Sequence, residues 1–400
     1  KKNLYTYEEV FTKKIKEYSL GQLEKKFIHN VTLTSLRNNF IIKEIVNTYL
    51  NKKKLTTDQY LILLSGINQI VFLNIKEYAV IFTMVELSKK KGFKSDPSLT
   101  NAILRKVVKN KDDLKLKKTK FELLPAWFKL NVNDWNSNTK VNFLDSIRLQ
   151  PELNIVFKNE KDIKKFKTKG VSTSLKSISL SSFENIRDLP DYEKGTWWVQ
   201  DYSAMLPISL LNDISNKKIV DMCSAPGGKA FQILAQNENL VMYEINNKRA
   251  KILKSNLERL NYKTEIYVED ALRISEGKKY DIVLLDAPCT SVGTIRRHPE
   301  IFFRDSDVNI NYYTNLQKNL LEKASKLVKK NGFILFMVCS FLKSETNQQV
   351  NRFIKNNKNF TIDPFALENN LLINKKGILK TIPQKLKNKF LIDGFFATKI

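Results

Sequence analysis

Short apolar runs alternate with helical patterns in the second half of the chain, and this alternation constrains the fold most strongly. The runs have the length and β-branched character of buried strands. They occupy residues 218–222, 240–244, 265–268, 280–285 and 333–338. Helical patterns at 248–260 and 311–327 lie between them. Because strands that alternate with helices are typical of a doubly wound parallel sheet, we predict an α/β domain over residues 201–400.

Two of the predicted strands end in a turn that carries a cysteine. Asp286-Ala287-Pro288-Cys289 comes after the run at 280–285, and Cys339 comes after the run at 333–338. In open α/β sheets, ligands bind at the carboxyl ends of the strands. If the two strands are sheet neighbours, their ends lie roughly 5 Å apart. Cys289 and Cys339 would then flank one small pocket beside Asp286.

The turn after the first predicted strand is the candidate cofactor site. It consists of Cys223, Ser224, Ala225, Pro226, Gly227, Gly228 and Lys229. Paired glycines between a strand and a helix let the backbone approach a ligand closely. The spacing matches neither the dinucleotide motif nor the triphosphate motif.

Carboxylates end the next two predicted strands. Glu244 stands where it can accept hydrogen bonds from both hydroxyls of a ribose, and Asp270 closes the third strand. A glycine-rich turn followed by two such acids suits an adenosine-bearing ligand without a polyphosphate. S-adenosylmethionine is such a ligand, and we predict it as the cofactor.

A thiolate beside a methyl donor suits methylation of an unreactive carbon such as C5 of cytosine. A cysteine that adds to C6 makes C5 enamine-like, so that C5 attacks the sulfonium methyl group. Asp286 could hydrogen-bond or protonate N3 and stabilise the adduct. A second cysteine could assist release of the product, and the base must be unstacked or single-stranded.

Charge and composition favour a polyanionic partner. The formal net charge is +27, which suits RNA or DNA, although compositional drift of a genome could also produce it. Three cysteines and two histidines lack metal-site spacing, so we expect no metal. With no apolar run near the ~20 residues of a membrane span and no leader, we expect a soluble, cytoplasmic, monomeric protein.

The first half of the chain predicts two further domains. Residues 1–118 have helical periodicity, as where Ile42, Ile45, Val46 and Tyr49 share one face, and predict an all-helical domain. A lysine-rich stretch at 114–120 is predicted as a linker. Residues 119–200 predict a small α+β module, with a strand at 154–157 and a basic helix around 161–167.

Four stretches resemble the RsmB/NOL1/NSUN superfamily of RNA cytosine-5 methyltransferases. They are 221–229, 286–299, Val338-Cys339-Ser340 and Asp393-Gly394-Phe395-Phe396. The resemblance implies a Rossmann-like class I methyltransferase domain. It also implies Cys339 as nucleophile, Cys289 as the cysteine that assists release, and Glu244, Asp270 and Asp286 as ligands of the cofactor or the base.

The predicted helical domain resembles the NusB-like RNA-binding domain of the family's bacterial 16S ribosomal RNA enzymes. The resemblance therefore implies 16S ribosomal RNA as substrate and partner. Arg296 and Arg297 are predicted to contact RNA, the alternative being that they hold their own loop through backbone carbonyls.

Other functions stay open at this point. The same chemistry could act on another RNA such as tRNA. A non-catalytic RNA-binding assembly factor could keep the sheet as a scaffold. An amino-group methyltransferase of DNA would need an Asn/Asp-Pro-Pro-aromatic turn, and Asp286-Ala287-Pro288-Cys289 argues against it.

Overall fold

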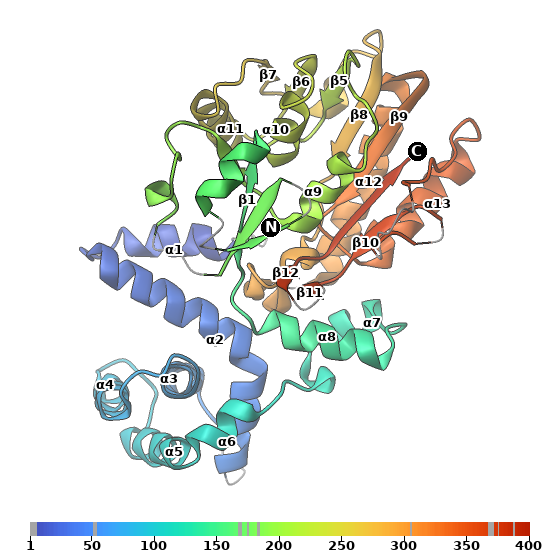
Figure 1. Cartoon of the computed structure of the whole chain (residues 1–400). Coiled ribbons are helices and arrows are strands. Elements are labelled where there is room, and N and C mark those ends of the chain that lie inside the picture. Colours follow the sequence, from blue (N-terminus) through green and yellow to red (C-terminus); the bar gives the residue numbers. More distant parts are fainter. Residues whose placement is uncertain are drawn as a thin grey trace. The chain divides into compact units, whose positions relative to one another are not determined.

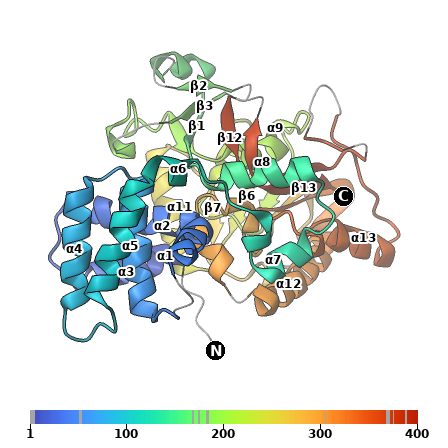
Figure 2. The ribbon, with the colours of Figure 1, turned by 90° about the horizontal axis from the view of Figure 1, so that it is seen from below.

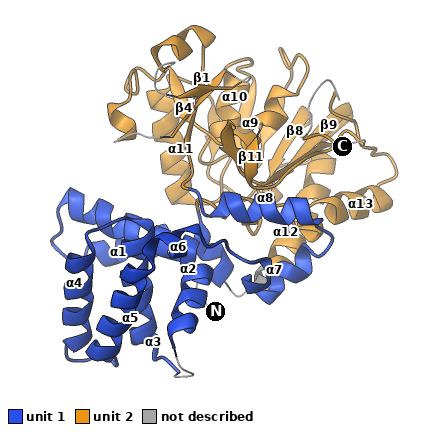
Figure 3. Cartoon of the chain, turned by 60° about the horizontal axis from the view of Figure 1, so that its bottom comes forward, with its two compact units in different colours: residues 1–149, 298–304 blue, residues 150–297, 305–400 orange. Residues whose placement is uncertain are grey.

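The computed structural model describes residues 6–400 apart from 51–53, 167–169, 174–175, 182–184, 305, 367–371, 375 and 387–388. The chain packs as two compact units: residues 1–149 with 298–304, and residues 150–297 with 305–400 (Figure 3). The structure therefore divides the chain near residue 150, whereas the predicted boundaries lie at 118 and 200. Among the described residues, no helix is both long and apolar enough to cross a membrane.

The first unit is helical. Its α-helices are α1 (Tyr7–Ile15), α2 (Gln22–Tyr49), α3 (Thr57–Ile67), α4 (Glu77–Lys89), α5 (Pro97–Lys109), α6 (Lys111–Leu116), α7 (Ala126–Asn131) and α8 (Ser137–Ile147). Helices α3, α4 and α5 pack against one another (Figure 2). Asp96 caps α5 by accepting from the backbone N–H of Ser98 and Leu99, and Pro97 fills the first helical position.

The core of this unit is aliphatic, and α2 contributes Ile41, Ile42, Ile45 and Val46 to it. The predicted linker at 114–120 is wrong at its start, because Leu114 is buried within α6.

The second unit begins with the predicted α+β module. Its four strands are β1 (Leu153–Phe157), β2 (Val171–Ser172), β3 (Ser177–Leu180) and β4 (Trp197–Val199), in the antiparallel order β2-β3-β1-β4. The predicted basic helix is a 3₁₀ helix at Glu160–Phe166.

A seven-stranded sheet forms the rest of this unit (Figure 1). Its strands are β5 (Ile219–Asp221), β6 (Leu240–Tyr243), β7 (Glu265–Tyr267), β8 (Tyr280–Asp286), β9 (Val328–Val338), β10 (Leu379–Thr381) and β13 (Phe395–Lys399). Their order is β10-β13-β9-β8-β5-β6-β7, with β13 antiparallel to β9. A hairpin of β11 (Gln384–Leu386) and β12 (Phe390–Ile392) precedes β13.

Helices cover both faces of this sheet. They are α9 (Tyr202–Ser209), α10 (Gly228–Leu234), α11 (Asn247–Arg259), α12 (Ser306–Leu327) and α13 (Asn347–Asn356). Along β8, Ile282 and Leu284 join the core under α9, α10 and α11, while Val283 and Leu285 join the core under α12 and α13. A strand that is buried on both faces explains the continuous apolar run in the sequence.

Strands β8 and β9 are parallel neighbours in the sheet. The two strands that precede Cys289 and Cys339 are therefore adjacent, as the predicted pocket requires. Asp286 is paired with Met337, two residues before Cys339. The two cysteine-bearing turns therefore leave the sheet at the same edge.

Candidate active site

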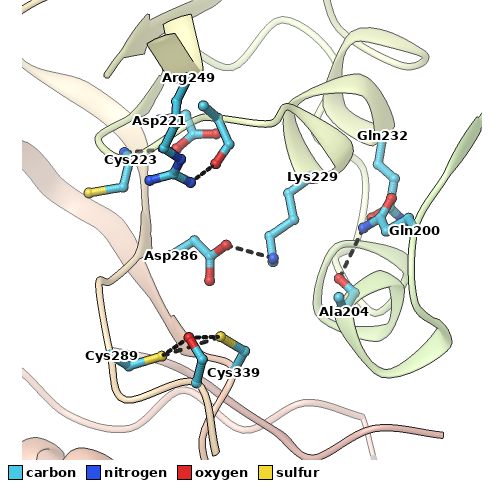
Figure 4. A network of polar contacts seen from close by, with 12 residues as sticks. Gln200, Ala204, Asp221, Cys223, Lys229, Gln232, Arg249, Asp286, Cys289 and Cys339 are labelled. Carbon is cyan, nitrogen blue, oxygen red and sulfur yellow. Dashed lines mark hydrogen bonds and ion pairs between the residues drawn. The ribbon is translucent and has the colours of Figure 1, made fainter. Parts of the chain in front are cut away.

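The thiols of Cys289 and Cys339 lie side by side just beyond β8 and β9. Their Sγ atoms are 3.3 Å apart, and the Ser291 hydroxyl is 3.5 Å from Cys339 Sγ. Figure 4 shows both side chains directed toward each other below Asp286. The topology thus brings together the pair that the sequence analysis singled out.

The two thiols differ in acidity. The hydrogen bond with Cys289 lowers the pKa of Cys339, and Ser291 and Lys229 act in the same direction. For Cys289, the same hydrogen bond and burial raise the pKa well above its ordinary value. Cys339 is therefore the thiol of the pair that loses its proton more readily, and the thiolate is the nucleophilic form of cysteine.

Lys229 and Asp286 form an ion pair above the thiols. Lys229 Nζ lies 2.7 Å from Asp286 Oδ2 (Figure 4). Lys229 comes from α10, and Asp286 is the last residue of β8. Asp221, at the end of β5, is buried beside them, and its burial raises its pKa to about 7. Three ionisable groups from three elements therefore meet here, and two of them, Asp286 and Lys229, act on Cys339.

A cavity of about 290 Å³ opens over these groups. Its wall is formed by the predicted cofactor turn from Cys223 to Lys229, together with Asp286, Cys339 and the turn Asp393–Phe395. Gly227 has φ +113°, and a Cβ there would lie 2.1 Å from the Phe231 ring. Glycine is therefore required where the turn passes α10.

The predicted ribose ligand has an unused acceptor. Glu244 is 2% exposed, and its Oε1 accepts the Asn246 N–H at 2.8 Å. Its Oε2 lies 3.4 Å from Arg249 Nη1 but has no hydrogen-bond partner among the described residues. A buried carboxylate oxygen left in this way fits a ribose hydroxyl. Asp270 instead caps its own turn by accepting the Leu272 N–H, and neither Glu244 nor Asp270 lines the cavity.

The two predicted RNA contacts behave differently. Arg296 is 1% exposed, and its Nε donates to Asp393 Oδ1 at 2.9 Å, so its guanidinium does not face an RNA phosphate. Arg297 is 37% exposed, lines the cavity and pairs with Asp393 Oδ2 at 2.5 Å. We therefore drop Arg296 as an RNA contact and keep Arg297 as a prediction.

The sequence analysis missed Asp201 and Gln200, which also line the cavity. Burial and the neighbouring Asp393 raise the pKa of Asp201. Gln200 Nε2 donates to Gln232 Oε1 at 2.7 Å and to the Ala204 carbonyl at 3.1 Å (Figure 4). Both residues precede α9, far from the recognisable motifs, so no local pattern marked them.

Backbone contacts tie three turns into one wall of the cavity. The Gly293 N–H donates to the Cys339 carbonyl at 3.0 Å, and the Gly394 N–H donates to the Gly293 carbonyl at 2.9 Å. A Cβ on Gly293 would lie 1.9 Å from the Gly394 oxygen. Glycine at this position therefore lets the turn after β12 close on the two cysteine turns.

The order of this sheet, with helices on both faces, is that of a Rossmann-like fold, and the family match makes it a methyltransferase domain that uses S-adenosylmethionine. Residues 208–400 match the family model described as 16S rRNA methyltransferase RsmB/F, and residues 2–109 match the NusB family. Residues 208–400 therefore form a domain of the RsmB/F methyltransferase type, and the first part of the chain carries a NusB-family domain. The predicted family and fold class are confirmed.

Curated relatives match over different lengths. The probable ribosomal RNA small subunit methyltransferase B of Coxiella burnetii is 26% identical, over 94% of this chain and 92% of its own length. The ribosomal RNA small subunit methyltransferase B of Pasteurella multocida is 27% identical, and the match covers 82% of this chain and 78% of that protein. The protein of that name from Photorhabdus laumondii is 38% identical over 172 residues, and the chain covers only 40% of its length.

Two solved structures share the fold. The crystal structure of PH0851 aligns with 96% of this chain and 92% of its own, with a TM-score of 0.71 and 20% identity. The crystal structure of NSun6 from Pyrococcus horikoshii with SFG aligns with 68% of this chain, over 96% of the NSun6 chain. The TM-score is 0.56 and the identity is 16%.

Proposed function

We propose that this methyltransferase transfers a methyl group to C5 of a cytosine in 16S ribosomal RNA through a covalent adduct with Cys339. The observation that carries the proposal is the 3.3 Å contact between the sulfur atoms of Cys289 and Cys339, because Cys339 lines the same cavity as the cofactor turn. S-adenosylmethionine supplies an electrophilic methyl group on sulfur when it is bound. The rest of the reaction depends on residues of this chain.

Residues of the cofactor turn and Glu244 fit the nucleoside end of S-adenosylmethionine. The free Oε2 of Glu244 would accept a ribose hydroxyl. Gly227 and Gly228 pack the turn tightly against the protein, because a Cβ would lie 2.1 Å from the Phe231 ring at the first position and 3.1 Å from the Gln200 side chain at the second. Glycine at both positions therefore fixes the path of the turn that would hold the cofactor.

Cys339 would act as the nucleophile. Its thiolate adds to C6 of the cytosine, and the electron pair of the C5–C6 double bond takes the methyl group. A water molecule then takes the C5 proton as base, the C5–H electron pair reforms the C5–C6 double bond, and the C6–S bond breaks with its electron pair returning to the Cys339 sulfur. Cys289, which its raised pKa keeps protonated, would donate a hydrogen bond to the departing Cys339 thiolate.

Asp286 and Lys229 would hold the base and balance its charge. The Asp286 carboxylate lies in the same cavity as Cys339, where it could accept a hydrogen bond from N3–H of the cytosine when N3 is protonated in the adduct. Lys229 holds that carboxyl in place at 2.7 Å, and its positive charge lies beside both Asp286 and Cys339. The adduct would thus form next to a fixed donor and acceptor pair.

Ribosomal RNA as substrate is supported by the RsmB/F family match and by the names of the full-length relatives. The NusB-family domain and the net charge of +27 are consistent with RNA binding. Monomeric state and cytoplasmic location stay predictions.

The proposal is tested by mapping the methylated atom. Unmodified 16S rRNA and a tRNA pool are incubated with the protein and S-adenosylmethionine, and the products are analysed by bisulfite sequencing and nucleoside mass spectrometry. We expect 5-methylcytidine at a discrete position in 16S rRNA. A methyl group on N4 of cytosine or on a ribose would overturn the chemistry, and methylation confined to tRNA would overturn the substrate.

A further inference from the structure

Glu345 is a buried acid that the proposed mechanism does not use. It ends the 3₁₀ helix Lys343–Glu345, just after the Cys339 turn, and is 0% exposed. Burying a carboxylate is costly unless hydrogen bonds satisfy its oxygens. The partners of this carboxylate therefore indicate why it is there.

Both oxygens of Glu345 bind residues that come directly after the two cysteines. Oε1 accepts the Thr290 N–H at 2.8 Å, and Oε2 accepts the Thr290 hydroxyl at 2.6 Å. Oε2 also accepts the Ser340 hydroxyl at 2.6 Å, and Gln317 of α12 donates to Oε1 at 3.3 Å. Thr290 is next to Cys289 in the chain and Ser340 is next to Cys339, so one carboxylate joins both thiol-bearing turns.

We propose that Glu345 is a positioning residue that fixes the separation of the Cys289 and Cys339 sulfur atoms. The inference deepens the proposed function and rests on it for its catalytic meaning. Short hydrogen bonds to a carboxylate are directional and about twice as strong as neutral ones. Three of them, to adjacent residues of two turns, leave each turn little freedom to shift the thiol that it carries.

Charge adds a second consequence of the same placement. Glu345 is among the groups that raise the pKa of Cys289, whereas Lys229 contributes to the lowered pKa of Cys339. The charge of Glu345 therefore acts on Cys289, and the charge of Lys229 acts on Cys339. This arrangement favours the proton on Cys289 and the thiolate on Cys339.

The separation of the thiols can be measured without RNA. Diamide takes the two thiol hydrogens and leaves a disulfide, at a rate that depends on how often the sulfur atoms meet. Wild-type protein, Glu345→Gln and Glu345→Ala are treated with diamide below their melting temperatures, and the Cys289–Cys339 disulfide is quantified by peptide mass spectrometry. Glu322→Gln, at a half-buried position of α12 away from the thiols, is the matched control for loss of a carboxylate.

We expect disulfide formation at least about tenfold slower in Glu345→Ala than in wild type, with Glu345→Gln between them and Glu322→Gln within twofold of wild type. Should Glu345→Ala not fold, Thr290→Val and Ser340→Ala each remove one hydroxyl contact and are expected to slow the reaction severalfold. Folded variants that cross-link at the wild-type rate would overturn the proposal.

A second measurement, the kinetics of methyl transfer, tests whether the position of the thiols affects catalysis. In Glu345→Gln we expect kcat for methyl transfer to fall at least about tenfold, while KM for RNA and the Kd for S-adenosylmethionine stay within threefold. A purely structural role would lower the folded fraction and leave kcat per folded molecule unchanged. If the wild-type enzyme methylates another atom, the proposed function fails, and the diamide rates still decide whether Glu345 positions the thiols.

Discussion

The acidity of Cys339 depends on its contact with Cys289. Replacing Cys289 by alanine removes the hydrogen bond that contributes most to the lowered pKa of Cys339. We predict that Cys289→Ala raises this pKa and slows alkylation of Cys339 by iodoacetamide about three- to tenfold at pH 7.5. Peptide mass spectrometry across a pH series measures the rate of alkylation at Cys339, and Cys223→Ala is the control. Unchanged or faster alkylation would contradict the assigned thiol pairing.

Asp221 makes stability depend on pH. Burial raises its pKa from 3.8 to about 7, so between these values the native state keeps a proton that the unfolded chain has released. Its contribution to stability is therefore present at low pH and lost as pH rises toward 7. Asn at this position can still accept the Cys223 N–H and does not ionise.

We predict that Asp221→Asn gains about 3 kcal/mol of stability relative to wild type between pH 5 and pH 8, because about two pH units lie below the folded pKa and each is worth about 1.4 kcal/mol. Urea unfolding at both pH values measures the change. A stability difference between the two proteins that is the same at pH 5 and pH 8 would show that Asp221 does not titrate in this range.

At the level of single residues, the sequence predicted the side chains that stand at strand ends and missed contacts between distant segments. Cys289, Cys339 and Asp286 stand at or just beyond the ends of apolar runs, so strand order alone placed them together. Arg296 was taken for an RNA contact because its partner, Asp393, lies 97 residues away in the chain. No local pattern could show that this pair is buried.

The turns at the edge of the sheet are held by backbone contacts that need glycine. A Cβ on Gly293 would lie 1.9 Å from the Gly394 oxygen and 2.8 Å from the Cys339 oxygen. We predict that Gly293→Ala costs about 2–4 kcal/mol of stability and abolishes methyl transfer. Gly277→Ala is the matched control, because its nearest neighbour would be Ser275 Oγ at 3.7 Å. Thermal unfolding and a methyl-transfer assay measure both variants, and a fully active Gly293→Ala would refute this reading.

Secondary structure was predictable where the hydrophobic pattern was strong. The five predicted strands correspond to β5, β6, β7, β8 and β9. Four of them are central strands whose burial on both faces leaves apolar runs, whereas β7 lies at the edge of the sheet and is partly exposed. The β8–β9 pairing could be stated only as a condition, since strand order is a long-range property. The antiparallel pairing of β13 with β9 likewise depends on tertiary contacts and was not predicted from the pattern.

Across the whole molecule, charge predicts how RNA binding responds to salt. With a net charge of +27, several phosphate contacts would release counterions on binding. We predict that raising salt from 50 to 200 mM weakens RNA binding by roughly a hundredfold or more. Fluorescence anisotropy with a labelled 16S rRNA fragment measures the Kd for RNA at each salt concentration. A change below about threefold would indicate that the charge reflects composition rather than a binding surface.

Division into units was less predictable than the sheet. Composition suggested boundaries at 118 and 200, yet residues 119–149 pack with the helical unit, and so does the short segment 298–304. That segment begins immediately after Arg296 and Arg297, so one motif in the sequence contributes to two units. Local composition cannot reveal such a division, because it arises from contacts between distant segments.

The covalent role of Cys339 is the central claim, and trapping the adduct tests it most directly. Cys289→Ser and Cys339→Ser are each incubated with 16S rRNA and S-adenosylmethionine, then denatured and analysed by gel electrophoresis and mass spectrometry. We predict that Cys289→Ser accumulates an RNA adduct on Cys339, because release is slowed after attack, and that Cys339→Ser forms none although it still binds the cofactor. An adduct on Cys289 in the Cys339→Ser protein, with none in Cys289→Ser, would contradict the account.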